Sequence, residues 1–428
     1  MPNFIITNVC NLRCPFCFAT EHMDHEHAGS AGRMSVEEFR RQLAFVGQQV
    51  VRFCGGEPTL HPNFIEMMTL ALEEPAREVF MMTNGVWPAP VREHIARLSR
   101  RDRRRVGFLF NVLPSAHYRP EQEAALHETL RMVDKARATL GVTLYEREYD
   151  HRHLFALADR YGFRRLRYSV ASPNVSDPRS WLVDPTRDFP ALAQIVYALT
   201  MEARRRDIFI HSDCGYLPPC MFTAEQLSAL YPPGDRMRDH AFNCSGPVDI
   251  GPGGEAWRCY GLFSTMRAKT SDFEHSGALG DYFEARTQET PFTPLFDACA
   301  TCELKEPYRC AGGCYALRSV QDLQHRADES LIQIGADPAF ARAVPRIKSD
   351  AVHVGERAGR PLLMLCDKSG TWSKLELSAW ETEVLLACDG RRSVAELSKI
   401  ANSDTARPKH NAARLLRRLF DQGALELT

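Results

Sequence analysis

Short apolar runs alternate with amphipathic segments over roughly the first 170 residues. A capping box, Ser35-Val-Glu-Glu38, opens one amphipathic segment, with Phe39, Leu43 and Phe45 among its apolar positions. The pattern predicts strands at 3–9, 50–54, 78–83, 106–112, 142–147 and 165–171, and helices at 35–47, 63–73, 89–100 and 151–161. Strand, helix and strand in this order predict an α/β fold with a parallel sheet.

The pattern changes towards the carboxyl end. A helical stretch is predicted near 187–206, and the charged residues 320–358 predict a helical connector. From Pro361, two apolar runs flank the turn-rich Asp367-Lys-Ser-Gly370, which predicts a hairpin. Helices are predicted at 378–387, from Ser393 onward and at 408–421, followed by a short strand at 424–427. A hairpin with three helices is a small winged-helix layout.

Length and charge narrow the class of protein. A chain of 428 residues with 44% apolar side chains predicts two or three domains and a compact soluble protein. The net charge of −1 provides no global field that would attract nucleic acid or an anionic membrane. No membrane span and no secretory signal is evident in the sequence, so we expect a cytoplasmic protein.

The 14 cysteines are unevenly distributed. A reducing compartment disfavours disulfides, so clustered thiols indicate metal ligands or catalytic groups. Cys10, Cys14 and Cys17 follow the first predicted strand, and three thiolates so close can hold an iron–sulfur cubane with one iron left open. The amino and carboxylate groups of S-adenosylmethionine (SAM) could chelate that iron. A zinc knuckle completed by His22, His25 or His27 is the alternative, although these histidines are expected in an exposed polar loop.

The segment Cys10-Asn-Leu-Arg-Cys14-Pro-Phe16-Cys17 resembles the cysteine signature of the radical SAM superfamily. The resemblance implies that these three cysteines hold a [4Fe–4S] cluster that cleaves SAM, and that Phe16 packs near the SAM adenine. It also implies that the strands form a partial (β/α)6 TIM-like barrel whose ligands gather at the carboxyl ends of the strands.

Three further strand ends carry candidate cofactor-binding residues. Gly55-Gly56-Glu57-Pro58 follows the second strand, where glycines allow close approach to the backbone and a carboxylate can receive an ammonium group. The motif resembles the one that holds the SAM amino group in radical SAM enzymes. Thr83-Asn84-Gly85 resembles the family's third strand end, which faces SAM. Asn111 and Ser115 are placed to approach the ribose or to cap a turn.

A second group of cysteines spans residues 214–314. Cys244-x9-Gly254-x4-Cys259 followed by Cys299-x2-Cys302-x7-Cys310-x3-Cys314 resembles the SPASM domain, in which the third spacing is usually five. The resemblance implies one auxiliary cluster on Cys244, Cys259 and Cys314, with Cys214 or Cys220 as the fourth ligand, and a second on Cys299, Cys302 and Cys310.

The second auxiliary cluster lacks an evident fourth ligand. Cys366 is the nearest candidate and lies in the predicted hairpin, so the cluster is three-ligated, uses the spare one of Cys214 and Cys220, or is absent. Two zinc sites on the eight cysteines are the other interpretation. Auxiliary clusters could accept or donate electrons, or bind substrate. Cys54 and Cys388 are expected to be buried and inert.

The carboxyl-terminal layout resembles the PqqD-like domain, also called the RiPP recognition element. That resemblance implies that the leader of a ribosomally made peptide adds a strand to the hairpin edge and lies along the third helix. DNA binding is an alternative because basic side chains crowd that helix: Arg407, Lys409, Arg414, Arg417 and Arg418. Basic and acidic residues are nearly balanced from Arg360 onward, so a nucleic-acid partner is not expected. The third interpretation is that this domain only packs against the rest of the protein and binds no ligand.

We therefore predict a radical SAM partial barrel at 1–185, a SPASM-like iron–sulfur domain at 186–320, a helical connector at 321–358 and a PqqD-like winged-helix domain at 359–428. The predicted function is radical modification of a precursor peptide by crosslinking, epimerisation or oxidation, with flavodoxin or ferredoxin as electron donor. Alternatives are a dehydrogenase or decarboxylase of a small metabolite, and a maturase of a folded protein such as a sulfatase. A non-enzymatic alternative is an iron–sulfur transcriptional sensor, but that interpretation gives the motif Gly55-Gly56-Glu57-Pro58 no role.

Overall fold

The computed structural model describes residues 2–17, 19, 32–171, 182–184, 187–214, 217–230, 244, 246–289, 295–296, 299, 302, 310, 312–319, 342–348, 352–357, 360–366, 372–401, 412–421 and 424–427. Several residues singled out in the sequence lie outside this part of the chain: His22, His25, His27, Arg407 and Lys409. The same is true of residues 321–341 in the predicted connector and of 408–411 in the last predicted helix.

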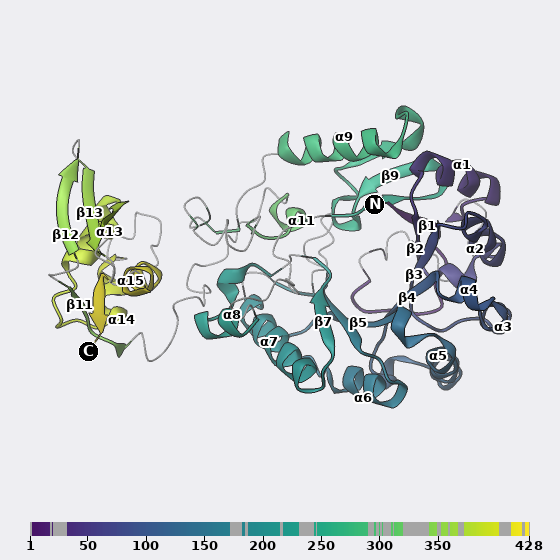
Figure 1. Ribbon diagram of the computed structural model, residues 1–428, viewed down its shortest axis with the longest axis horizontal. Helices are drawn as coiled ribbons and strands as arrows, with labels where there is room; N and C mark the ends of the chain where they lie inside the picture. The colour runs from purple at the N-terminus through teal and green to yellow at the C-terminus, as the bar shows by residue number, and fades with distance from the viewer. Residues whose placement is uncertain are drawn as a thin grey trace.

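A curved sheet organises the larger part of the molecule, with helices on its outer side (Figure 1). Among the described residues it has ten strands, in the order β10-β9-β8-β1-β2-β3-β4-β5-β6-β7. The parallel strands are β1 (Asn3–Thr7), β2 (Val50–Gly55), β3 (Glu78–Thr83), β4 (Val106–Asn111), β5 (Ala138–Leu144), β6 (Arg165–Val170) and β7 (Phe209–Ser212). The helices that follow them in the chain are α1 (Val36–Val46), α2 (Phe64–Glu73), α3 (Ala89–Arg97), α4 (Arg100–Arg103), α5 (Pro120–Met132), α6 (Arg152–Tyr161) and α7 (Phe189–Arg205). This confirms the predicted partial TIM-like barrel.

Each parallel strand presents one face to the helices and the other to the inside of the barrel. On β2, Phe53 stacks on Phe39 of α1 with ring centroids 5.4 Å apart, and it meets Phe64 of α2 at 5.7 Å. Because successive strand residues point to opposite faces, Arg52 and Cys54 face the inside. The aromatic face of the sheet therefore forms the core, and the other face lines the lumen.

The barrel differs from the prediction in three places. Helix α5 has no predicted counterpart because only a few apolar residues, such as Leu126 and Leu130, define its buried face. Strand β7 has only four residues, too short for a clear pattern. Strand β5 is Ala138–Leu144 rather than 142–147, because all seven of its residues are buried and it lacks the alternation of a half-exposed strand.

The cysteine-rich region continues the sheet on its other edge. Strand β8 (Val248–Ile250) runs parallel to β1, and β9 (Glu255–Arg258) and β10 (Arg267–Lys269) follow as an antiparallel hairpin. Helices α8 (Ala224–Leu230), α9 (Ser276–Glu289) and α11 (Tyr315–Arg318) belong to the same region. The side chain of Asn3 on β1 donates to Asp249 on β8 at 2.7 Å, so this region is joined directly to the barrel.

The carboxyl-terminal unit has a hydrophobic core of its own, separate from that of the barrel. It contains an antiparallel sheet β12 (Val352–Arg357), β13 (Arg360–Cys366) and β14 (Trp372–Glu376), followed by helices α13 (Ala379–Leu386), α14 (Val394–Ala401) and α15 (Ala412–Asp421). The predicted hairpin and three helices are present. The helical prediction for 321–358 is wrong over its described end, since β11 (Pro345–Ile347) and β12 are strands. The final strand, β15 (Leu425–Leu427), pairs with β11 and not with the hairpin.

Within the part of the chain that the structure describes, no helix is both long and apolar enough to cross a membrane.

Candidate metal and cofactor site

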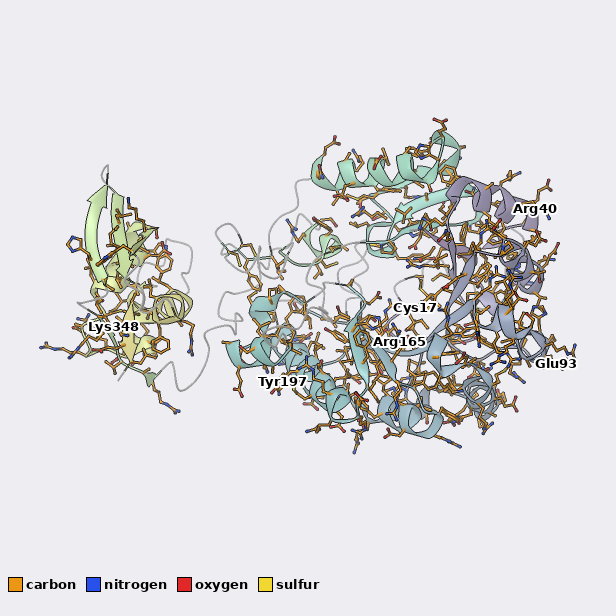
Figure 2. All side chains as sticks on the ribbon, viewed as in Figure 1. Cys17, Arg40, Glu93, Arg165, Tyr197 and Lys348 are labelled. Carbon is orange, nitrogen blue, oxygen red and sulfur yellow. The ribbon has the colours of Figure 1, made fainter. Side chains whose placement is uncertain are left out.

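The three cysteines Cys10, Cys14 and Cys17 lie in the loop that follows β1, at the carboxyl end of that strand. Figure 2 shows Cys17 on the concave side of the sheet. A backbone hydrogen bond from Cys17 N–H to the Cys14 carbonyl, at 3.2 Å, closes the turn between two of the thiols. All three cysteine residues are partly exposed.

Asn11 fixes this loop against the rest of the barrel. Its side chain donates to the Val86 carbonyl at 2.8 Å and accepts a hydrogen bond from the Asn84 amide, also at 2.8 Å. Its own carbonyl accepts from Gln122 at 2.7 Å. The Asn84 amide nitrogen also lies 3.8 Å from the Cys10 sulfur. Asn84, predicted to contact the cofactor, therefore also positions the cysteine loop.

Gly55 and Gly56 are required by a close approach of two backbone segments. A Cβ atom at Gly55 would lie 2.3 Å from the Thr7 carbonyl oxygen, and one at Gly56 would lie 2.2 Å from that of Val9. Gly55 also has φ +143°, a conformation that favours glycine. Gly56 N–H donates to Thr7 at 2.8 Å. What approaches these glycines in the structure is thus the chain that leads into the cysteine loop.

Gly56→Ala is expected to displace this loop and to destabilise the fold by about 1–3 kcal/mol, because the methyl group would overlap a backbone oxygen. The melting temperature and the iron content after anaerobic reconstitution should both fall. Gly280→Ala is the matched control, since nothing lies within 4 Å of a Cβ there. Equal iron content in the Gly56→Ala and Gly280→Ala proteins would contradict the assignment.

Glu57 is fully buried and both of its carboxylate oxygens receive hydrogen bonds. Thr59 donates through its hydroxyl at 2.7 Å and its N–H at 3.2 Å, the Thr83 hydroxyl lies 2.9 Å from each oxygen, and Asn84 N–H donates at 2.8 Å. Burial raises the pKa of Glu57, and these hydrogen bonds oppose that rise. The carboxylate thus joins the end of β2 to the end of β3. The motif's last residue, Pro58, opens the adjoining turn and is buried.

Burial raises the pKa of the Cys10 thiol to about 11 and that of Cys14 to about 12. At neutral pH both thiols are therefore protonated in the protein alone, and a positively charged metal centre is needed to hold them as thiolates. Three sulfur donors in one short loop fit an iron–sulfur cluster by the chemistry of the donor set. The residues present thus suit the cluster that the cysteine signature implies.

Aromatic rings line one side of the cysteine loop. Phe16 packs on Tyr145, just beyond β5, with ring centroids 5.3 Å apart. Tyr145 in turn contacts Tyr149 at 5.4 Å. Asn111 at the end of β4 and Ser115 in the turn after it are both exposed. The carboxyl ends of β4 and β5 therefore contribute to the same edge of the sheet as the cysteine loop.

The structure brings four cysteines of the second group near one another. Burial raises the pKa of the Cys214 thiol well above its usual value, and neighbouring charges raise it further, in the order Asp213, Cys314, Cys244 and Cys259. Cys314 is likewise affected by burial and then by Cys244. Cys220, by contrast, is 7% exposed and belongs to the hydrophobic core. Cys214 lies near the other three, which favours it as the fourth ligand.

Cys299, Cys302 and Cys310 are the other group. Burial raises the pKa of Cys310, and the charges of Cys302 and Cys299 add to that rise. Gly312 N–H donates to the Cys310 sulfur at 3.3 Å, which opposes it. As they stand, no three His, Cys, Asp or Glu side chains of the described residues are arranged to hold a single metal ion.

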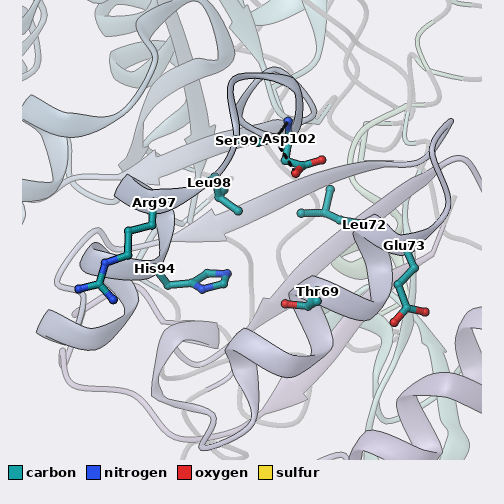
Figure 3. A pocket seen from close by; sticks show the side chains of 8 residues that line it. All are labelled: Thr69, Leu72, Glu73, His94, Arg97, Leu98, Ser99 and Asp102. Carbon is teal, nitrogen blue, oxygen red and sulfur yellow. Dashed lines mark hydrogen bonds between the residues drawn. The ribbon is translucent and has the colours of Figure 1, made fainter.

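A pocket of about 370 Å³ lies elsewhere, between the carboxyl ends of α2 and α3 (Figure 3). It is lined by Thr69, Leu72, Glu73, His94, Arg97, Leu98, Ser99 and Asp102. None of these residues belongs to the cysteine loop or to the strand ends beside it. The pocket is therefore not part of the candidate site.

Residues 4–146 match the family model of the radical SAM superfamily, and the chain therefore contains a radical SAM domain. Members of this superfamily are enzymes, and the domain implies SAM and a [4Fe–4S] cluster as cofactors. GTP 3′,8-cyclase of Klebsiella pneumoniae subsp. pneumoniae is 37% identical over 84 residues, which are 19% of this chain and 25% of the cyclase. The chain thus matches about a quarter of the length of this curated relative.

Two solved structures share the fold over a larger part of the chain. Streptococcus suis SuiB bound to precursor peptide SuiA has a TM-score of 0.50 and 17% identity, covering 73% of this chain and 71% of SuiB. Native anSMEcpe with bound AdoMet has a TM-score of 0.53 and 13% identity, covering 75% of this chain and 92% of that one. At these identities the likeness extends to the fold alone.

Proposed function

We propose that this protein is a radical SAM enzyme that modifies a ribosomally synthesised precursor peptide. The observation that carries the proposal is the three-thiol loop after β1, held against Gly55 and Gly56 inside a barrel that matches the radical SAM model. When bound, the cluster would supply the electron for reductive cleavage of SAM, and SAM would supply the radical chemistry that removes a hydrogen atom from the peptide.

The chain's own residues bind and orient these groups. Cys10, Cys14 and Cys17 would hold three irons and leave the fourth open to SAM. Phe16 and Tyr145 would form an aromatic wall beside the adenine, with Asn111 and Ser115 towards the ribose. Because Glu57 is engaged by Thr59, Thr83 and Asn84, the backbone oxygens of the Gly55–Gly56 turn would receive the SAM amino group, while the carboxylate keeps that turn in place.

The second cysteine group would hold auxiliary clusters. Cys214, Cys244, Cys259 and Cys314 would ligate one fully, and Cys299, Cys302 and Cys310 would ligate a second one with three protein ligands. Such clusters could remove an electron from the substrate radical, which favours crosslinking or oxidation. We propose that the barrel extends beyond the predicted boundary at 185 to Ser212, because β7 pairs with β6, and that the SPASM-like region follows it to residue 320.

Cys214→Ala is expected to lower the iron content and to alter the EPR spectrum of the reduced auxiliary cluster, because it removes the fourth thiolate. Cys220→Ala is the matched control and should leave both unchanged, since Cys220 is 7% exposed and is packed within the hydrophobic core. An unchanged spectrum in Cys214→Ala, or a changed one in Cys220→Ala, would reverse the assignment of the fourth ligand.

The carboxyl-terminal unit is the proposed peptide-binding part. Its three-stranded antiparallel sheet has edge strands β12 and β14, and an extended leader peptide can add a strand to such an edge. SuiB, which shares the barrel fold, has been solved with its precursor peptide SuiA. We propose the same class of partner here, with a flavodoxin or ferredoxin as electron donor in the cytoplasm.

A small metabolite is the second candidate substrate. One curated relative, a GTP 3′,8-cyclase, has a name that indicates a small-molecule substrate. That match covers 84 residues, a fifth of this chain and a quarter of the cyclase. So short a match leaves the substrate open.

The function is tested by anaerobic incubation of the reconstituted full chain with SAM, a reductant and the short peptide encoded beside its gene. Mass spectrometry should show a defined mass change in the peptide core together with 5′-deoxyadenosine. Release of 5′-deoxyadenosine without any change in the peptide, combined with turnover of a free metabolite, would favour the second candidate.

A further inference from the structure

The inside of the barrel carries charged side chains, whereas the lumen of a (β/α) barrel is usually packed with branched apolar ones. Alternation along the strands places Arg52 of β2 and Arg167 of β6 on this inner face, since their neighbours Phe53 and Leu166 are fully buried on the helix side. Strands β2 and β6 are not adjacent in the sheet, so the two guanidinium groups approach each other across the lumen.

Arg52 has no counter-charge among the residues that the structure describes. Its pKa is lowered by burial and then by the nearby charge of Arg167, and in the described part of the chain no carboxylate lies within ion-pair distance of it. Arg167 is paired with Asp213. The other acid of the lumen, Asp249, accepts a hydrogen bond from Asn3 at 2.7 Å, and burial raises its pKa to about 7. Neither acid neutralises Arg52.

A neutral polar side chain, His211, lies beside two arginines. His211 of β7 lies beside Arg167 in the strand register, and its ring Nδ1 is buried without a hydrogen-bond partner. Burial and the two nearby arginines, Arg167 and Arg165, lower the pKa of His211 to about 4, so the ring is neutral at pH 7. It can offer one further hydrogen bond to a ligand. A partly buried cation without a partner is costly, and an anionic ligand would remove that cost.

The position of Arg52 distinguishes this ligand from SAM. Arg52 precedes Gly55 by three residues, and at the rise of a strand this places it about 10 Å below the turn at the carboxyl end. The cysteine loop and the proposed SAM contacts lie at that carboxyl end. Arg52 therefore faces the lumen beneath the proposed cofactor site, a space that a substrate side chain held under the cofactor would reach.

We propose that Arg52 binds a carboxylate of the substrate within the barrel and so selects peptides that carry an acidic group near the modified residue. The inference rests on the proposed function and specifies its substrate class. The carboxylate could belong to an Asp or Glu side chain or to the peptide's carboxyl terminus. Arg167, held by Asp213, adds positive potential, and His211 offers a hydrogen bond to the same group.

The test compares Arg52→Gln with the unsubstituted full chain, using the neighbouring precursor peptide as substrate. Arg52→Gln should lower kcat/KM for peptide modification by at least about 30-fold, the usual effect of breaking a buried charge pair, while 5′-deoxyadenosine formed without peptide stays unchanged. Arg52→Lys should retain part of the activity. Arg40→Gln, on the outer face of α1, is the matched control and should have no effect (Figure 2).

Substituted peptides identify the anion. With the unsubstituted enzyme, changing one Asp or Glu of the peptide core to its amide should lower kcat/KM as much as Arg52→Gln does. With the Arg52→Gln enzyme, the same peptide change should lower kcat/KM little further. If the peptide's carboxyl terminus is the bound group, a carboxyl-terminal amide should give these two results instead. Arg52→Glu should recover activity with a peptide that carries Lys at the acidic position. Full activity of Arg52→Gln, or an additive loss, would overturn the inference alone. Failure of the unsubstituted enzyme to modify the peptide would overturn the proposed function as well.

Discussion

Cys14→Ala should reduce SAM cleavage to below about 1% of the unsubstituted protein, because three thiolates are the minimum that keeps the cluster in its loop. The change leaves only Cys10 and Cys17 of the three thiols in this loop. The iron content should fall by about four atoms per chain. The measurement is 5′-deoxyadenosine release under dithionite together with iron analysis of the same sample.

Cys388→Ala provides the comparison. Cys388 is 2% exposed in the core of the carboxyl-terminal unit, and its thiol donates to the Val384 carbonyl at 3.3 Å. Its loss should leave both iron content and SAM cleavage unchanged. Iron retained in Cys14→Ala with undiminished SAM cleavage would show that the cluster is held elsewhere.

Leu416→Asp should weaken binding of the precursor peptide by at least about 100-fold while leaving peptide-independent SAM cleavage intact. Leu416 on α15 is fully buried among the apolar residues of the carboxyl-terminal unit, and an unpaired carboxylate there would cost several kcal/mol. Because this unit has a core separate from that of the barrel, its unfolding should spare the cofactor site. Fluorescence anisotropy of a labelled leader peptide measures the binding.

The same substitution at an exposed site controls for added charge. Leu386 at the end of α13 is 60% exposed, so Leu386→Asp should change neither leader binding nor SAM cleavage. If Leu416→Asp bound the leader as tightly as the unsubstituted chain, the peptide-binding role of this unit would have to be abandoned in favour of a packing role.

The barrel could be predicted where the pattern of a single strand is clear. Strand β3 begins and ends where predicted because buried and half-buried residues alternate along it. Strand β5 is displaced because it is buried on both faces, and α5 is missing because its apolar stripe is sparse. Local patterns record exposure, so they fail where an element is wholly enclosed or mostly solvated.

The candidate site likewise contains residues that could be predicted from nearby sequence and residues whose role depends on contacts with distant parts of the chain. The thiols of Cys10, Cys14 and Cys17 are close in sequence and could be found from spacing alone. The choice of Cys214 over Cys220 depends on contacts with residues up to 100 positions away, and both cysteines are equally plausible along the chain.

Other roles become visible only in three dimensions. Glu57 was expected to face a ligand, whereas the fold turns it towards Thr59, Thr83 and Asn84. Asn11 lies between Cys10 and Cys14 and is not one of the motif's defining residues, so nothing in the sequence indicates that it ties the loop to Val86 and Gln122. The unpartnered state of Arg52 likewise depends on what strands β6 and β8 bring into the lumen.

The most direct test is whether the anaerobically reconstituted chain converts SAM into 5′-deoxyadenosine and methionine when a low-potential reductant is added. The structure predicts both products in equal amounts, with release that requires iron and all of Cys10, Cys14 and Cys17. A protein that holds its full complement of iron at these cysteines and yet leaves SAM intact under reducing conditions would contradict the assignment of this loop as a radical SAM centre.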